Sequence, residues 1–73
     1  MKINGHFVDT SDYVRTHGKA PKGRGNWWFK VHGIYSQPVE VNVSFVTMRQ
    51  AIPLAVAQSG IDSPYVSKIE VMP

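Results

Sequence analysis

The side chains that could perform chemistry in this 73-residue chain are three histidines, five carboxylates and a group of cations near two tryptophans. His6, His17 and His32 do not lie at the spacing of zinc ligands, and the chain has no cysteine to supply a thiolate. No serine lies in a recognisable nucleophile motif. We therefore expect no metal, no cofactor and no catalytic residue.

The remaining motifs with possible chemistry have structural explanations. Asp9 and Asp12 are the closest pair of carboxylates, and both are typical of the start of a helix. The segment 18–25, GKAPKGRG, has the glycines and cations of a phosphate-binding loop, but it precedes a predicted strand instead of following one and opening a helix. These observations favour a binding module over an enzyme.

Positive charge is concentrated in one part of the chain. The net charge is +3, and no acidic residue lies between Asp12 and Glu40, where five of the eight Lys and Arg residues lie. Such a field attracts an anionic partner, either nucleic acid or an acidic protein surface. A solvated surface without a partner would have the same composition.

The pair Trp27-Trp28 divides the predicted strand 26–32 into two faces, because consecutive strand residues point in opposite directions. One indole must therefore lie near solvent, unless the short helix predicted at 11–17 covers it. If Trp28 is the exposed one, it forms an aromatic and basic patch with its neighbours. The candidate partner-binding residues are Arg15, Lys19, Lys22, Arg24, Trp28, Lys30, His32 and Tyr35.

The first half of the chain predicts a hairpin, a short helix and a strand. Asn4-Gly5 is the signal of a two-residue hairpin turn. Capping residues before Tyr13 and a glycine at position 18 predict a helix over 11–17, with Tyr13 and Val14 packed on the sheet. A mobile loop over 18–25 then leads to the strand 26–32, whose inner face carries Trp27, Phe29 and Val31.

The second half predicts a strand, a longer helix and a final strand. Val39, Val41, Val43 and Phe45 alternate with polar residues, which predicts a strand with these four side chains on one face. A capping box starts a helix at 47 that ends at 60, and Pro53 within it predicts a kink or a loosened first turn. Residues 65–72 form the last strand. The fold class is α+β, a small antiparallel β-sheet packed on one main α-helix with a short N-terminal helix, in a single domain over 1–73.

The composition also indicates in which cellular compartment the protein is expected. A small domain without cysteine suits a reducing environment, and the chain contains neither a signal-peptide pattern nor about 20 consecutive apolar residues. We expect a cytoplasmic protein that is a monomer when free and does not interact with membranes.

The strand segment GNWWF, the capped helix over 47–60 and the terminal IEVMP resemble, in size and layout, small host-takeover proteins of tailed bacteriophages. This family includes short transcription regulators that bind host RNA polymerase, one of them from a Xanthomonas phage. The resemblance spans the whole chain but carries no residue-level motif, so it assigns no functional positions. It implies binding to host RNA polymerase, with inhibition of transcription initiation, antitermination, or both, in the host bacterial cytoplasm.

Two other functions fit the same residues. The basic loop and the Trp-bearing strand could bind DNA or RNA directly, with cations on phosphates and an aromatic ring stacked on bases. A similar small phage protein could instead inhibit a host defence complex.

Overall fold

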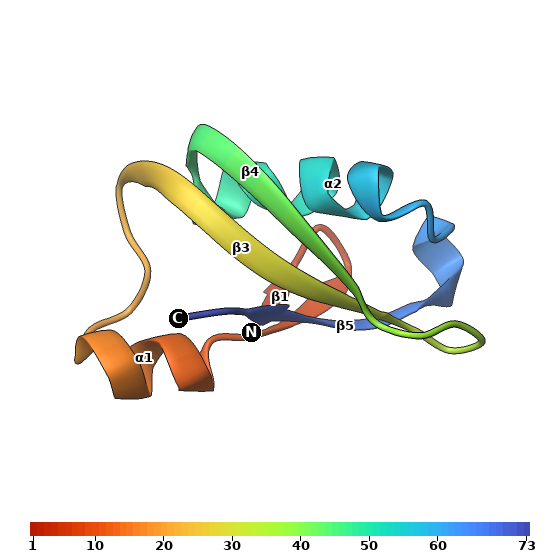
Figure 1. The fold of residues 1–73 in the computed structure, drawn as a ribbon, viewed down its shortest axis with the longest axis horizontal. Helices are drawn as coiled ribbons and strands as arrows, with labels where there is room; N and C mark the ends of the chain where they lie inside the picture. Colours follow the sequence, from red (N-terminus) through yellow and green to blue (C-terminus); the bar gives the residue numbers. More distant parts are fainter.

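Five strands, two α-helices and one 3₁₀ turn follow one another in the predicted order, in a computed structural model that describes residues 1–73 (Figure 1). The α+β fold class, with one main helix on a sheet and a short N-terminal helix, is confirmed. The elements are β1 (Lys2–Ile3), β2 (His6–Asp9), α1 (Ser11–His17), β3 (Arg24–Gly33), β4 (Val39–Thr47), α2 (Met48–Ser59), the 3₁₀ turn (Ser63–Tyr65) and β5 (Val66–Val71).

The five strands form one sheet in the order β1-β2-β5-β3-β4. All neighbouring pairs are antiparallel except β2 and β5, which are parallel, with Val8 beside Ile69. The sheet is therefore mixed, where the sequence predicted an antiparallel one. The parallel pair joins the two ends of the chain, so no local turn signal could have indicated its direction.

Local signals produce the N-terminal elements as predicted. Asn4 and Gly5 both have positive φ, 52° and 81°, which a type I′ hairpin turn requires. At the start of α1, Asp9 Oδ1 accepts hydrogen bonds from the backbone N–H of Ser11 at 2.9 Å and from its hydroxyl at 2.6 Å. These bonds lower the pKa of Asp9, the hydroxyl contributing most. Gly18 ends α1 in the left-handed conformation.

The helix α2 begins with the predicted capping box. The Thr47 hydroxyl accepts from the Gln50 N–H at 3.2 Å, and the Thr47 N–H donates to the Gln50 side chain at 3.0 Å. The helix is continuous from Met48 to Ser59 with Pro53 exposed inside it, and the kink there stays a prediction. Gly60, in the left-handed conformation, ends it.

The core lies between α2 and one face of the sheet. It contains 14 buried residues, all of them hydrophobic, and no polar or charged side chain. Phe29 and Val31, predicted on the inner face of β3, and Ile69 and Val71 of β5 are at most 1% exposed. The opposite face of the sheet carries Trp28 and the charged residues of the central strands, so the two faces have different chemistry.

Two details of the predicted strands are wrong. Arg24 and Gly25 belong to β3, so the loop after α1 is shorter than predicted. Phe45, predicted on the inner face of β4, is 82% exposed with φ of 68°. The cause is a β-bulge: Gly25 pairs with Val46 and Asn26 with Ser44, which leaves Phe45 without a partner.

Candidate binding surface

A groove of 330 Å³ opens at the end of the sheet where β3 begins and β5 ends. Residues of α1, the following loop, β3 and the C-terminal segment line it, and none of them is acidic. Figure 1 shows α1 beside the C-terminus at this end, with the loop rising from α1 to β3. The lining residues are Tyr13, His17, Lys22, Arg24, Gly25, Asn26, Trp27, Trp28, Met72 and Pro73.

One tryptophan is buried and the other is exposed, as the alternation of side chains along a strand requires. Trp27 is 5% exposed, and its indole N–H donates to the carbonyl of Val46 at 2.7 Å. Tyr13 of α1 packs on Trp27, with ring centroids 5.8 Å apart. Trp28 remains 48% exposed at the groove, so α1 does not cover it. An indole that is half exposed beside cations is a typical interface anchor.

Only some of the candidate cations reach the groove. Lys22 and Arg24 line it, and Lys19 is exposed in the same loop. Arg15 lies on α1, where it forms an ion pair with Asp12 at 2.9 Å. The two side chains are 75% and 49% exposed, so this pair contributes little to stability.

Lys30 and His32 lie further along β3, among carboxylates. Lys30 is aligned with Glu40 of β4 on one side and Glu70 of β5 on the other. His32 Nε2 is 2.5 Å from Glu70 Oε1, and Lys68 also approaches Glu70, at 3.7 Å. The open face of the sheet is thus a mixed ionic surface, and we name these five residues the sheet centre. It is not the basic patch that the sequence predicted around Trp28.

Tyr35 is separated from the other candidates. It lies in the connection between β3 and β4, at the opposite end of β3 from the groove, and is 84% exposed. Its ring contacts Tyr65 edge to face, with centroids 5.7 Å apart. The structure therefore does not bring Tyr35 together with Trp28.

The bulge in β4 adds residues that sequence analysis did not place at the surface. Arg24 donates two hydrogen bonds to the carbonyl of Phe45, from Nε at 3.2 Å and Nη2 at 2.8 Å. Arg49 is exposed in the first turn of α2, a position where the helix dipole disfavours a cation. The one sequence signal for this arrangement is Phe45-Val46, since two consecutive apolar residues cannot both face the core of a regular strand.

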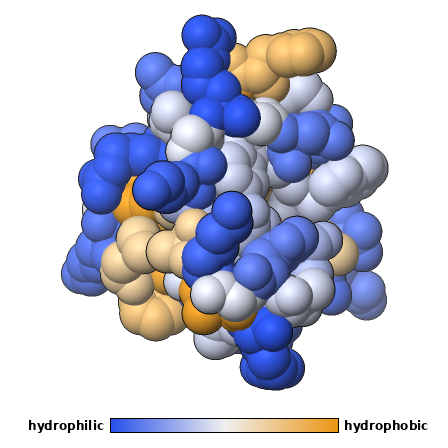
Figure 2. Space-filling model, turned by 90° about the vertical axis from the view of Figure 1, so that its left-hand side faces the viewer, coloured by the Kyte–Doolittle hydropathy of each residue, from blue (hydrophilic) through white to orange (hydrophobic).

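These parts form one surface, which we name the basic end: residues 18–26 together with residues 44–49, joined where residues 24–26 of β3 pair with residues 44, 46 and 47 of β4. It contains Lys19, Lys22, Arg24 and Arg49 and no acidic residue. Figure 2 shows the molecule from this side: hydrophilic side chains cover most of it, and hydrophobic ones lie in separate small groups. Its electrostatic character suits an acidic partner surface.

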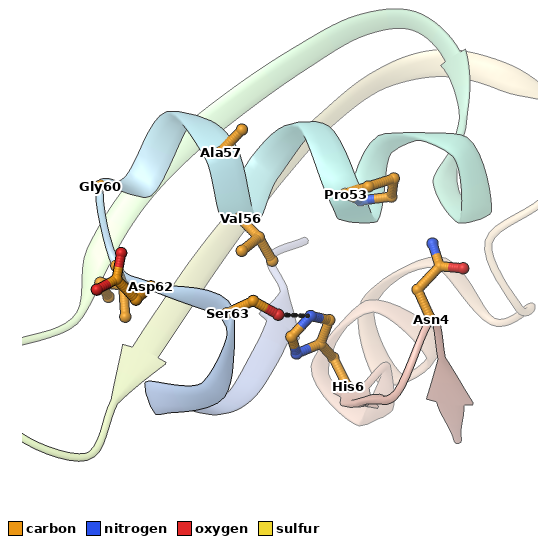
Figure 3. Close-up of a pocket in the computed structure, with 9 residues that line it drawn as sticks. Asn4, His6, Pro53, Val56, Ala57, Gly60, Asp62 and Ser63 are labelled. Atoms are coloured by element: carbon orange, nitrogen blue, oxygen red, sulfur yellow. Dashed lines mark hydrogen bonds between the residues drawn. The ribbon is translucent and has the colours of Figure 1, made fainter.

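A second cleft, of 490 Å³, lies between the N-terminal hairpin and the end of α2. There the Ser63 hydroxyl and His6 Nε2 are 3.2 Å apart, a contact that a nucleophile and its base would make. Figure 3 shows Asp62 on the far side of Ser63 from His6, so it does not orient the imidazole. Without a third group in line, the pair has the geometry of an ordinary surface hydrogen bond.

No three His, Cys, Asp or Glu side chains come together in a way that could hold a metal ion. None of the helices combines the length and the apolar character that crossing a membrane requires. No family model matches the chain, and neither a curated protein nor a solved structure is similar to it.

Proposed function

We propose that this protein is a small, non-enzymatic binding module that docks through the basic end on an acidic surface of bacterial RNA polymerase. Docking there inhibits transcription initiation, promotes antitermination, or both, in the bacterial cytoplasm. The observation that carries the proposal is the groove, where Lys22, Arg24 and the half-exposed Trp28 meet without an acidic residue. The polymerase as partner comes from the resemblance in size and layout to phage regulators.

The distribution of carboxylates favours a protein partner over nucleic acid. A strand that stacks bases or enters a groove of DNA needs a face that phosphates can approach. The face of β3 that carries Trp28 also carries Lys30, which is aligned with Glu40 and Glu70 of the neighbouring strands, and His32, whose ring contacts Glu70. These carboxylates repel a phosphate backbone, whereas a folded partner can place complementary charges opposite them.

The proposal is tested with purified core enzyme and holoenzyme of bacterial RNA polymerase, treated with nuclease and immobilised. We expect the wild-type protein to be retained by at least one form, and added salt to weaken the retention. The double variant Lys19→Glu with Lys22→Glu should lower the affinity at least tenfold, because it reverses two charges at the basic end. Arg24 is left intact since its hydrogen bonds to Phe45 support the bulge.

The matched control is Lys2→Glu, an exposed cation on β1 outside the basic end. This variant should bind like the wild type. A promoter-initiated transcription assay and a terminator read-through assay then show whether the bound protein acts on initiation, on termination, or on both. If the wild type is retained by neither core enzyme nor holoenzyme, the proposal is wrong. Retention that appears only on enzyme left untreated by nuclease would instead support direct nucleic-acid binding.

A further inference from the structure

Phe45 combines two properties that are uncommon together in a bulky residue. Its side chain is 82% exposed, and its backbone lies in the left-handed region, with φ of 68°. A single exposed apolar residue needs no explanation, but an aromatic residue with positive φ is a genuine outlier. We propose that Phe45 is an apolar anchor that inserts into a pocket with an acidic rim on the partner protein. This inference rests on the binding function proposed above.

The bulge exists at the expense of core packing. Without it, the alternation along β4 would turn Phe45 to the side of Val41 and Val43, which are buried. The extra residue reverses the next position, so Val46 packs against the core and Phe45 points to solvent. The largest apolar side chain of β4 is therefore the one that contributes least to the core.

Neighbouring side chains hold the bulge in place. The guanidinium of Arg24 donates twice to the carbonyl of Phe45, and the indole of the buried Trp27 donates to the carbonyl of Val46. Beside them, the Ser44 hydroxyl donates to the Asn26 side-chain carbonyl at 2.6 Å. A strained backbone persists where its surroundings fix it, and such sites cluster where molecules bind or react. A ring presented on a fixed backbone also loses little conformational entropy on binding.

Charge around the ring decides which partner it fits. Arg24 contacts the Phe45 backbone, and Lys19, Lys22 and Arg49 lie on the same basic end, which has no acidic residue. An exposed aromatic ring on a surface that carries cations and no carboxylates complements an apolar pocket with carboxylates at its rim. Stacking of the ring on a nucleobase is the competing arrangement, and the test below separates the two.

The test compares stability with affinity in one variant. Asparagine adopts the left-handed conformation more readily than phenylalanine, so Phe45→Asn removes the ring and relieves the backbone. We expect its Tm to equal or exceed that of the wild type by up to roughly 5 °C. Its affinity for immobilised, nuclease-treated RNA polymerase should fall at least tenfold. A residue with a purely structural role would lower the Tm instead.

Two further variants serve as controls. Tyr35→Asn removes a ring that is 84% exposed at the opposite end of β3, and it should bind like the wild type. Phe45→Tyr keeps a ring of similar size and should retain most of the affinity. If the wild type and Phe45→Asn bind equally well, Phe45 is not an anchor, but the proposed function is unaffected. If the wild type does not bind, the proposed function is wrong, and so is the proposed role of Phe45, which depends on it.

Competition with single-stranded RNA and DNA separates the two arrangements. If Phe45→Asn loses binding to the nucleic acid but keeps its affinity for the polymerase, the ring stacks on bases and the inference is overturned. Loss of polymerase affinity alone supports it.

Discussion

The sheet centre and the basic end both carry cations from one short stretch of sequence, yet they differ in what surrounds those cations. At the sheet centre, Lys30 and His32 lie beside Glu40 and Glu70 of neighbouring strands. At the basic end, four cations lie on elements that contain no acidic residue. Cross-strand neighbours therefore determine which charged side chains are available to a partner protein.

The two regions also differ in what they contribute to the folded state. The side chains of His32 and Glu70 are 22% and 27% exposed, so they form a partly buried polar contact within the sheet. Lys22 at the basic end has no such carboxylate partner, and its side chain is exposed. The sheet centre therefore contributes chiefly to stability, whereas the basic end is the surface proposed for binding.

The largest expected effect separates the two tryptophans, of which Trp27 fills the core and Trp28 borders the groove. Trp27→Ala removes a buried indole and its hydrogen bond to Val46, and should lower the free energy of unfolding by about 3–5 kcal/mol. Trp28→Ala should lower it by no more than about 1 kcal/mol, because the side chain is half exposed. Urea unfolding monitored by circular dichroism measures both. Similar losses would mean that Trp28 is part of the core.

The second prediction compares charges in the two regions. Glu70→Gln removes the carboxylate that His32 and Lys68 approach, and should lower the free energy of unfolding by about 1 kcal/mol. Lys22→Gln should change it by less than about 0.5 kcal/mol, because no carboxylate is paired with this side chain. Urea titrations at neutral pH measure both values. A larger loss for Lys22→Gln would show that the basic end also supports the fold.

The third prediction concerns the local electrostatic potential around Trp28. In Trp27→Phe, where Trp28 is the only indole, iodide should quench the fluorescence more strongly than caesium, because Lys22 and Arg24 line the same groove. In Trp28→Phe the remaining indole is buried, and neither ion should quench it well. Stern–Volmer plots at equal ionic strength give the comparison. Stronger quenching by caesium would contradict a positive potential at the groove.

The smallest expected effect lies outside both regions, at the start of α1. The pKa of Asp9 lies below its ordinary value of 3.8, chiefly because the Ser11 hydroxyl donates to it. Asp9 therefore stabilises the fold above pH 3.8, and this contribution is lost as the pH falls through the lowered pKa of the folded state. Ser11→Ala should raise the pKa of Asp9 towards 3.8, as measured by NMR titration. An unchanged pKa would show that the backbone hydrogen bond alone is sufficient.

Most of the fold was predictable because its signals are local. The glycine after His17 ends α1 and the capping box starts α2, each within a few residues of sequence. The expected side-chain cap of α1 does not form, because Thr10 at its N-cap makes no side-chain hydrogen bond. The inner face of β3 follows from alternation alone. The parallel pairing of β2 with β5 depends on segments from opposite ends of the chain, and no local pattern contains it.

The candidate surface was less predictable, because it depends on contacts between strands. Alternation in β4 placed Phe45 inward, and only the pairing of Gly25 with Val46 turns it outward. Lys30 and His32 had no predicted carboxylate neighbour, since Glu70 is 38 positions away from His32 in sequence. Alternation did require one exposed indole, but the contact between Tyr13 and Trp27 was needed to identify it.

Hydrogen–deuterium exchange of this protein, alone and bound to RNA polymerase, tests most directly whether the basic end is the contact surface. The account predicts slower exchange on binding at the backbone amides of residues 18–26 and 44–49. It predicts no change in the N-terminal hairpin or in the connection that contains Tyr35. Protection confined to the hairpin or to that connection, with the amides of the basic end unchanged, would contradict the account.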